Sequence, residues 1–203
     1  MKVTKIEIQQ KNKKRVSVFC DDEYAFSLSA ETAIKHSIKV GSEITQAQIN
    51  NLTYESDALT AINKASEYVT KGLKTKKQIA DHLKNKGFEP SIIENAIKVL
   101  SEYKLVNDEQ YIKAFIADHQ SYGELKLKQE LLLKGIDKEL LDNYFNNTYE
   151  VNLEKLEALK NKFFKGKEQS LENIIKCKKH LLSKGFKYED INMLNWSEHE
   201  SWD

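Results

Sequence analysis

The chain has 203 residues and a formal net charge of +1, because 32 lysine and arginine residues nearly balance 31 aspartate and glutamate residues. This length is sufficient to bury a core, and the balanced charge argues against a protein dedicated to coating nucleic acid. One proline and seven glycines argue against a loop-rich or disordered chain, and the abundance of Lys, Leu, Ile, Glu and Ala favours a mainly helical protein.

The cysteines and the apolar runs bear on the compartment of the protein. Cys20 and Cys177 lie far apart without CxxC spacing, so the sequence predicts neither a disulfide framework nor a zinc site. No apolar run approaches the roughly 18 residues of a membrane span, and the polar start MKVTKIEIQQ lacks the apolar core of a signal peptide. We therefore expect a cytoplasmic protein that does not contact a membrane.

Residues 1–28 differ from the rest because their apolar side chains recur with a period of two, which is typical of strands. The polar stretches KNKK and DDE separate three such runs, so we expect a small β-meander. A short helix is expected after a Ser29 cap, and Thr45 with Gln48 has the pattern of a capping box that opens the helical remainder. The alternating residues are Ile6, Ile8, Val16, Val18, Cys20, Tyr24, Phe26 and Leu28.

A helix, a Lys-Gly pair and a second helix recur three times in the remainder of the chain. The glycines are Gly87, Gly135 and Gly185, and apolar residues occupy matching positions on both sides of each one. Glycine accepts the left-handed conformation that ends many helices, so each pair predicts a helix C-terminus. A period of about 50 residues indicates a repeated supersecondary unit. The matched stretches are LKNKGFEPSIIENAIKVL, LLLKGIDKELLDNYF and LLSKGFKYEDINML.

Each repeated unit also needs a helix upstream, and residues 57–71, 108–121 and 150–164 have apolar residues three and four apart. The prediction is a mainly α protein in which tandem three-helix, winged-helix-like repeats form an elongated, curved array behind a small N-terminal β-meander. The expected division is a β-rich region at 1–50, repeat 1 at 51–106, repeat 2 at 107–148, and repeat 3 with a C-terminal tail at 149–203.

Residue types that carry catalysis or bind metals do not cluster in this sequence. The five histidines are dispersed without HxxxH or HExxH spacing, and neither a glycine-rich phosphate loop nor a GxSxG motif occurs. Asp21, Asp22 and Glu23 are adjacent between two expected strands, a position that favours a turn over a cation site. We expect no enzyme activity, no cofactor and no metal. The histidines are His36, His82, His119, His180 and His199.

Lysine is the residue type that does cluster, where the first helix of a repeat turns into the second. One lysine on a solvated helix face is ordinary, but clusters at equivalent places favour a surface for a polyanion or an acidic partner. Tyr68, Tyr111 and Tyr122 lie nearby and either stack on bases or pack in the repeat cores. The candidate binding residues are Lys71, Lys74, Lys76, Lys77, Lys126, Lys128, Lys134, Lys176, Lys178 and Lys179.

Three further segments carry a family resemblance: YVTKGLKTKKQIADHLKNKGF at 68–88, VLSEYKLVNDEQYIKAFI at 99–116 and YGELKLKQELLLKGI at 122–136. Together with the third copy of the repeat they cover 57–195, and they resemble the RecX regulators of bacterial homologous recombination. The chain departs from the family where arginines are expected, since it has Lys71 or Lys74, and His119; Asn107-Asp108 replaces paired aspartates. Lysine lacks the planar fork of arginine, so only the clusters, and not single residues, are carried over.

The resemblance implies a monomeric, non-enzymatic protein of DNA repair, homologous recombination and the SOS response. Such a protein binds the RecA filament on single-stranded DNA and inhibits or modulates its ATPase, strand-exchange and coprotease activities, while binding bare single-stranded DNA only weakly. The near-zero net charge agrees with this expectation. Two alternatives stay open, namely a tandem winged-helix-like protein that acts directly on DNA and a helical scaffold for another partner.

Overall fold

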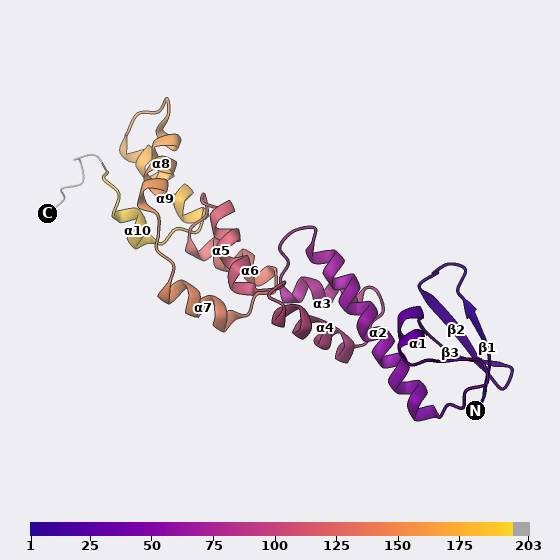
Figure 1. Cartoon of the computed structure of the whole chain (residues 1–203). Coiled ribbons are helices and arrows are strands. Elements are labelled where there is room, and N and C mark those ends of the chain that lie inside the picture. The colour runs from indigo at the N-terminus through magenta and orange to yellow at the C-terminus, as the bar shows by residue number, and fades with distance from the viewer. Residues whose placement is uncertain (197–203) are drawn as a thin grey trace. The chain divides into compact units, whose positions relative to one another are not determined.

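The fold is mainly helical, as predicted, and the computed structural model describes residues 1–196 (Figure 1). This part of the chain contains ten helices and one three-stranded sheet. The chain divides into two compact units, one from Met1 to Val106 and one from Asn107 onward. No helix of residues 1–196 combines the length and the apolar character needed to cross a membrane. His199 lies outside the described residues.

The N-terminal sheet is the predicted antiparallel meander. The predicted alternation is confirmed along the middle strand and at Phe26 and Leu28, whose side chains are buried. Ile8 departs from it: this residue ends an edge strand of the sheet, and it is 68% exposed. The strands, in sheet order, are β1 (Val3–Ile8), β2 (Arg15–Cys20) and β3 (Glu23–Ser29).

Near the turn between β2 and β3, one predicted core residue lies on the opposite face of the sheet from the one expected. A register shift after Val18 pairs Tyr24 with Phe19, so the tyrosine lies on the outer face, where it is 59% exposed. Asp21 and Asp22 form the turn itself, with φ of 50° and 69°. The acidic run is therefore a hairpin turn, in agreement with the turn interpretation.

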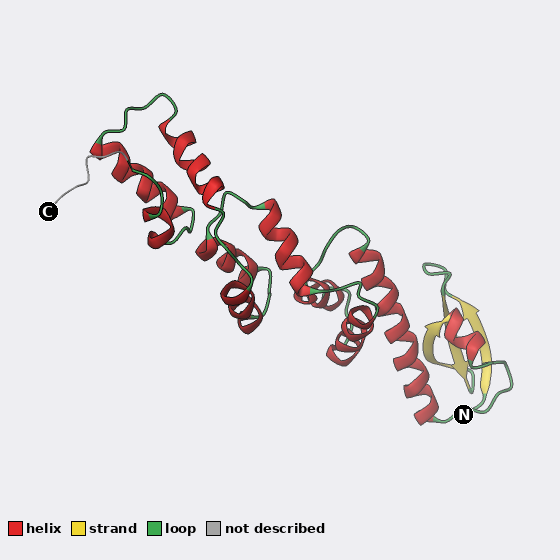
Figure 2. Ribbon diagram, turned by 60° about the vertical axis from the view of Figure 1, so that its left-hand side comes forward, coloured by secondary structure: helices red, strands yellow, loops and turns green. Residues whose placement is uncertain are grey.

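One long helix, α2 (Gln46–Val69), connects the sheet to the first repeat. It begins with the predicted capping box of Thr45 and Gln48. Ile49 and Leu52 pack on the sheet, whereas Ala61 and Ala65 are buried in the core of repeat 1. Figure 2 shows the sheet on one side of this helix and two shorter helices on the other. The short helix α1 (Ala30–Lys35) has the predicted Ser29 cap.

Three three-helix repeats follow, as predicted. In each repeat the residues eight and four positions before the glycine are at most 1% exposed, so the matched apolar positions form the repeat cores. Repeat 1 comprises the C-terminal part of α2, α3 (Lys76–Lys84) and α4 (Pro90–Glu102); repeat 2 comprises α5 (Asp108–Asp118), α6 (Glu124–Leu133) and α7 (Lys138–Asn147); repeat 3 comprises α8 (Leu153–Phe164), α9 (Leu171–Ser183) and α10 (Tyr188–Asn192).

Each Lys-Gly pair ends the second helix of its repeat, as predicted. Gly87, Gly135 and Gly185 have φ of 84°, 80° and 85°, which is the left-handed region. In repeat 1 the Phe88 N–H donates to the Leu83 carbonyl at 3.3 Å, and matching bonds occur in the other two repeats. This pattern is the Schellman turn, which bonds carbonyl groups that the helix end leaves free.

Repeats 2 and 3 are joined by backbone bonds between the start of α6 and the turn that contains Gly185. The Gly123 N–H donates to the Lys184 carbonyl at 2.9 Å, and the Leu125 N–H donates to the Gly185 carbonyl at 3.0 Å. Gly123 is the N-cap residue of α6 and has no side chain with which to cap it. Carbonyl groups of the following repeat therefore bond N–H groups at the start of this helix.

Candidate interaction surface

The candidate lysines of repeat 1 surround the turn from α2 into α3. Lys76 and Lys77 are the first two residues of α3, whose first turn has no acidic residue. Lysines at this position add their charge to the positive end of the helix dipole, so this end of α3 attracts anions. Lys77 forms a surface ion pair with Asp81 at 3.5 Å. Lys71, Lys76 and Lys77 are exposed, and Lys74 is half-buried.

Lys128 of repeat 2 is partly buried and forms two ion pairs. Its ammonium nitrogen lies 3.2 Å from a Glu124 carboxylate oxygen and 3.4 Å from an Asp142 oxygen, and its side chain is 23% exposed. Glu124 also pairs with Lys187, the residue before α10, at 2.5 Å. Lys128 therefore links α6 to α7, and the sequence showed no sign of this because Asp142 lies far along the chain.

Five of the candidate lysines lie over aromatic rings. Such contacts are worth about 0.5–1 kcal/mol at exposed sites and hold the aliphatic stem against the edge of a core. Tyr68, Tyr111 and Tyr122 pack against the cores of their repeats, in agreement with the core interpretation. The distances from nitrogen to ring centre are 5.2 Å for Lys74 and Tyr68, 4.3 Å for Lys126 and Tyr122, 5.2 Å for Lys128 and Phe145, 5.5 Å for Lys134 and Phe115, and 5.0 Å for Lys178 and Trp196.

The lysines of α9 in repeat 3 have different environments. Lys176 pairs with Glu172 at 2.6 Å on the helix surface, and Lys179 is exposed. Lys160 of α8, which was not among the candidates, is 5% exposed and donates to the Asn195 carbonyl at 2.6 Å. Lys160 also pairs with Glu157, three residues earlier on the same helix, at 2.5 Å. Its burial gives no signal in sequence, because the segment around Asn195 that covers it is distant in the chain.

The exposed face of the second helix differs in chemistry between the repeats. Two positions, ten and three residues before the glycine, lie on one face because they are seven residues apart. At these positions the apolar side chains of repeats 2 and 3 are between 42% and 54% exposed. The face is thus basic in repeat 1 and apolar in the other two. The residues are Lys77 and Lys84 in repeat 1, Leu125 and Leu132 in repeat 2, and Ile175 and Leu182 in repeat 3.

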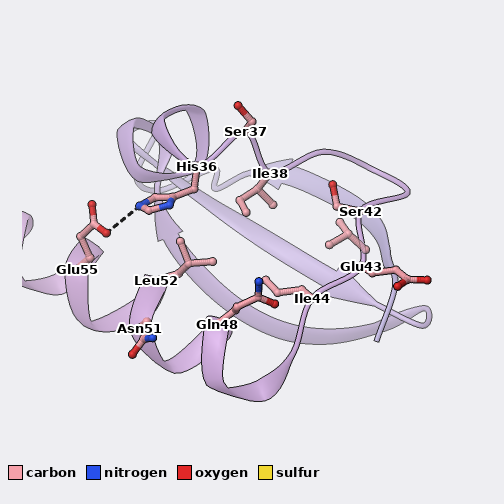
Figure 3. A pocket seen from close by; sticks show the side chains of 11 residues that line it. His36, Ser37, Ile38, Ser42, Glu43, Ile44, Gln48, Asn51, Leu52 and Glu55 are labelled. Atoms are coloured by element: carbon pink, nitrogen blue, oxygen red, sulfur yellow. Dashed lines mark hydrogen bonds and ion pairs between the residues drawn. The ribbon is translucent and has the colours of Figure 1, made fainter.

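An open pocket of about 400 Å³ lies beside the N-terminal half of α2 (Figure 3). His36 Nε2 lies 2.8 Å from one Glu55 oxygen, and Lys35 donates to the other at 2.7 Å. These two bonds, that from Lys35 first, hold the pKa of the Glu55 carboxyl below its ordinary value. The Ser42 hydroxyl accepts the backbone N–H of Lys39 at 3.3 Å. The polar groups of this pocket therefore stabilise the junction of α1, its following loop and α2.

Neither metal ligands nor thiolates form a site in the part of the chain that is described. Within residues 1–196, no three His, Cys, Asp or Glu side chains come together so that they could hold a metal ion. Cys20 and Cys177 are free and buried, and burial raises the pKa of both thiols. Both are therefore protonated at neutral pH, which makes them poor nucleophiles.

Comparison with known proteins gives one family along most of the chain. Matching family models are the N-terminal domain of regulatory protein RecX at residues 1–45, the first three-helix domain of RecX at 61–100 and the second at 107–143. Regulatory protein RecX of Clostridium beijerinckii is 40% identical over 195 residues, which cover 93% of this chain and 91% of that protein. Regulatory protein RecX of Clostridium tetani is 33% identical over 196 residues, which cover 94% and 91%.

Solved structures with the same name have the same fold. A crystal structure of regulatory protein RecX matches 95% of this chain and 97% of its own chain, with a TM-score of 0.70 and 24% identity. The crystal structure of RecX from Lactobacillus salivarius matches 67% of this chain and 92% of its own, with a TM-score of 0.62 and 25% identity.

Proposed function

The chain belongs to the RecX family of regulatory proteins, and from this membership we propose that it binds the RecA filament on single-stranded DNA and regulates it. The proposed effect is inhibition or modulation of the ATPase, strand-exchange and coprotease activities of RecA. The protein acts as a cytoplasmic, non-enzymatic monomer, and its affinity for bare single-stranded DNA is weak.

The observation that carries this proposal is the mixed chemistry of the second-helix face. Lys77 and Lys84 present charge in repeat 1, where a phosphate backbone or an acidic protein surface is attracted. Leu132 and Leu182 present exposed apolar side chains at the equivalent position of repeats 2 and 3. Exposed apolar residues at matched places are typical of a surface that contacts protein. A filament of protein on DNA offers both kinds of surface.

The rival function, direct binding of DNA by all three repeats, fits this face less well. A tandem DNA-binding array needs positive charge on the same face of each repeat, because phosphates supply most of the affinity. Lys128 is engaged with Glu124 and Asp142, which lowers the charge that repeat 2 offers to a phosphate. The direct DNA-binding function remains the second candidate because the start of α3 in repeat 1 is basic.

A salt titration separates the two functions. The affinity for single-stranded DNA is measured with and without assembled RecA, over the same series of salt concentrations. Under the proposed function the filament binds more tightly than bare DNA, and bare DNA binding falls steeply with salt because each phosphate contact releases counterions. Equal affinities across the series, or full RecA ATPase activity with the protein in excess, would contradict the proposal.

Two variants test which part of the second-helix face contacts DNA and which part contacts protein. The double change Lys77→Glu and Lys84→Glu removes charge from repeat 1, and the double change Leu132→Gln and Leu182→Gln removes apolar surface from repeats 2 and 3. We expect both to weaken filament binding and only the first to weaken bare DNA binding. Lys98→Glu, at an exposed position of α4, is the matched control for a change of charge. Lys128 is left unchanged because its loss would disturb the fold.

A further inference from the structure

A second basic feature of repeat 1 lies apart from the start of α3. It is a pocket of about 200 Å³ between the C-terminal end of α2 and the last turn of α3. Three ammonium groups and one carboxylate line it, so the pocket is positively charged whatever the state of its histidine. Only Lys71 among the lining residues was a candidate from the sequence. The lining residues are Lys64, Glu67, Tyr68, Lys71, His82 and Lys86.

The pocket is organised by a stacked pair of rings. Tyr68 of α2 and His82 of α3 lie face to face, with ring centres 4.2 Å apart and planes 2° from parallel. Because both helices are fixed by the core of repeat 1, the stack holds the imidazole at a defined place. Lys64 and Lys71 approach from the side of α2 and Lys86 from the end of α3.

The imidazole is kept neutral by these surroundings. Burial first, and then the charges of Lys86, Lys64 and Lys71, lower the pKa of His82 below its ordinary value. Glu67 is the one carboxylate among the lining residues. At neutral pH the pocket therefore holds three ammonium groups beside a neutral imidazole that resists protonation.

Repeat 3 has a looser counterpart of this ring pair, around a histidine that is exposed. His180 stands five residues before its glycine, as His82 does, and lies 5.6 Å from the Phe163 ring of the preceding helix. Burial, Lys184 and Lys167 lower the pKa of His180. Repeat 2 has Glu130 at this position. Lys184 stands one residue before its glycine, as Lys86 does, so repeats 1 and 3 share the histidine position and one lysine position.

We propose that the Tyr68–His82 pocket binds a backbone phosphate of single-stranded DNA and takes up a proton on His82 when the phosphate enters. A phosphate suits it because lysine binds phosphate as a point charge, and three ammonium groups around one pocket match an anion that presents several acceptor oxygens. The choice of DNA rests on the proposed function, since the filament presents that strand.

A bound phosphate reverses the electrostatic effect of the lysines on the imidazole. The anion neutralises nearby ammonium charges and favours the imidazolium form, which can donate a hydrogen bond to a phosphate oxygen. The pKa of His82 is therefore higher in the complex than in the free protein. Affinity rises as the pH falls between these two values, by up to about tenfold for each pKa unit of difference.

The experiment measures the binding of oligothymidylate to the full chain by fluorescence anisotropy, without RecA, between about pH 5.5 and pH 7.5 at constant salt. Thymine and the phosphodiester do not titrate in this range, so a pH effect belongs to the protein. We expect several-fold tighter binding at the acidic end. The variant His82→Gln is expected to lose most of this pH effect.

The substitution Lys86→Gln tests the pocket without changing the stacked rings of Tyr68 and His82. Lys86 is exposed beyond the end of α3, so we expect the fold to persist and affinity to fall about threefold to tenfold at low salt, as for loss of one phosphate contact. Lys98→Gln carries the same charge change on α4 and should leave affinity almost unchanged. Equal effects of the two lysine variants, or a pH effect that survives His82→Gln in full, would overturn the proposal.

Inhibition of RecA by the same variants is also measured, at the highest pH of the series. This measurement separates failure of the phosphate site from failure of the regulatory function. If the histidine variant inhibits RecA normally but the parent shows no pH-dependent oligothymidylate binding, the phosphate site is wrong and the regulatory function stands. If the parent binds oligothymidylate with the expected pH effect but leaves RecA fully active, the regulatory function is wrong and the phosphate site stands. Tighter binding of poly-glutamate than of oligothymidylate would assign the pocket to an acidic protein instead and overturn the phosphate assignment.

Discussion

The turns at Gly87 and Gly185 have the same conformation and different surroundings. Their φ angles are 84° and 85°, and both end the second helix of a repeat with the same bonds. A Cβ atom at Gly87 would meet nothing within 4 Å. A Cβ atom at Gly185 would overlap the Lys126 backbone nitrogen, because the start of α6 packs directly on this turn. One glycine is needed for its φ angle alone, and the other also for the absence of a side chain.

This difference shows that a repeated sequence pattern specifies the local turn without specifying what packs on it. Leu83 and Leu181 are fully buried in both repeats, so the turns share their local core contacts. At the Gly185 turn, backbone carbonyl groups also accept hydrogen bonds from N–H groups at the start of α6. Lys187, which follows the turn, pairs with Glu124. Contacts between repeats 2 and 3 are thus built on a turn whose first role is to end a helix.

The largest expected effect is that of Gly185→Ala. The substitution combines a left-handed φ with overlap against backbone atoms that cannot rotate away, and we expect a loss of about 3 kcal/mol or more in the free energy of unfolding. Thermal unfolding measures the loss, and hydrogen exchange in α6 and α9 locates it. Gly123→Ala should act in the same direction, because its Cβ would overlap the Phe186 nitrogen and the Gly185 carbonyl group. Stability equal to that of Gly87→Ala would show that the two repeats do not pack this way.

An intermediate effect is expected for Glu124→Gln. The Glu124 side chain is 11% exposed and pairs with both Lys128 and Lys187, so the neutral amide should cost about 2 kcal/mol. Glu172→Gln is the matched control, because the Glu172 side chain is 77% exposed and pairs with Lys176 on the surface of α9. We expect little change from the control. Equal melting temperatures for the two variants would mean that the Glu124 pairs do not stabilise the joint.

The same ion pair predicts a dependence on alkaline pH. The hydrogen bond to Glu124 raises the pKa of Lys187 above its ordinary value of 10.5. A raised lysine pKa contributes stability below the value in the unfolded chain, and this contribution is lost as the pH rises through the folded value. The melting temperature of the parent should therefore fall more steeply above pH 10.5 than that of Lys187→Gln. Parallel curves for the two proteins would contradict the stabilising role of this pair.

The smallest effect is expected for Gly87→Ala. Space is free around this position, so only the left-handed φ matters, and the expected loss is about 1 kcal/mol. Gly87→Val should cost more because of its branched Cβ, and Gly87→Asn should cost less. Chemical denaturation of the three variants gives the order. Unchanged stability of the valine variant would show that the left-handed turn is not required in solution.

The sequence indicated clusters of lysine at the candidate site, but it did not indicate what each lysine does. Repetition of lysine near the second helix of each repeat predicted a binding surface, but two features of this region could not be seen in the sequence. Lys128 pairs with Asp142, and His82 stacks on Tyr68 from another helix. Both pairs join residues that lie 14 positions apart in the chain and on different helices, so no spacing rule for one helix could reveal them.

The sequence by itself determined the strand alternation, the Thr45 capping box and the left-handed glycines, because each depends on residues within one or two turns of the chain. Only the tertiary structure decided that Gly123 and Gly185 meet, that Lys128 faces inward and that Tyr24 faces outward. Close backbone approach leaves no periodic signal in either partner, since each glycine already has a local reason to be there. Burial of a charged side chain likewise depends on partners that only folding brings within hydrogen-bonding distance.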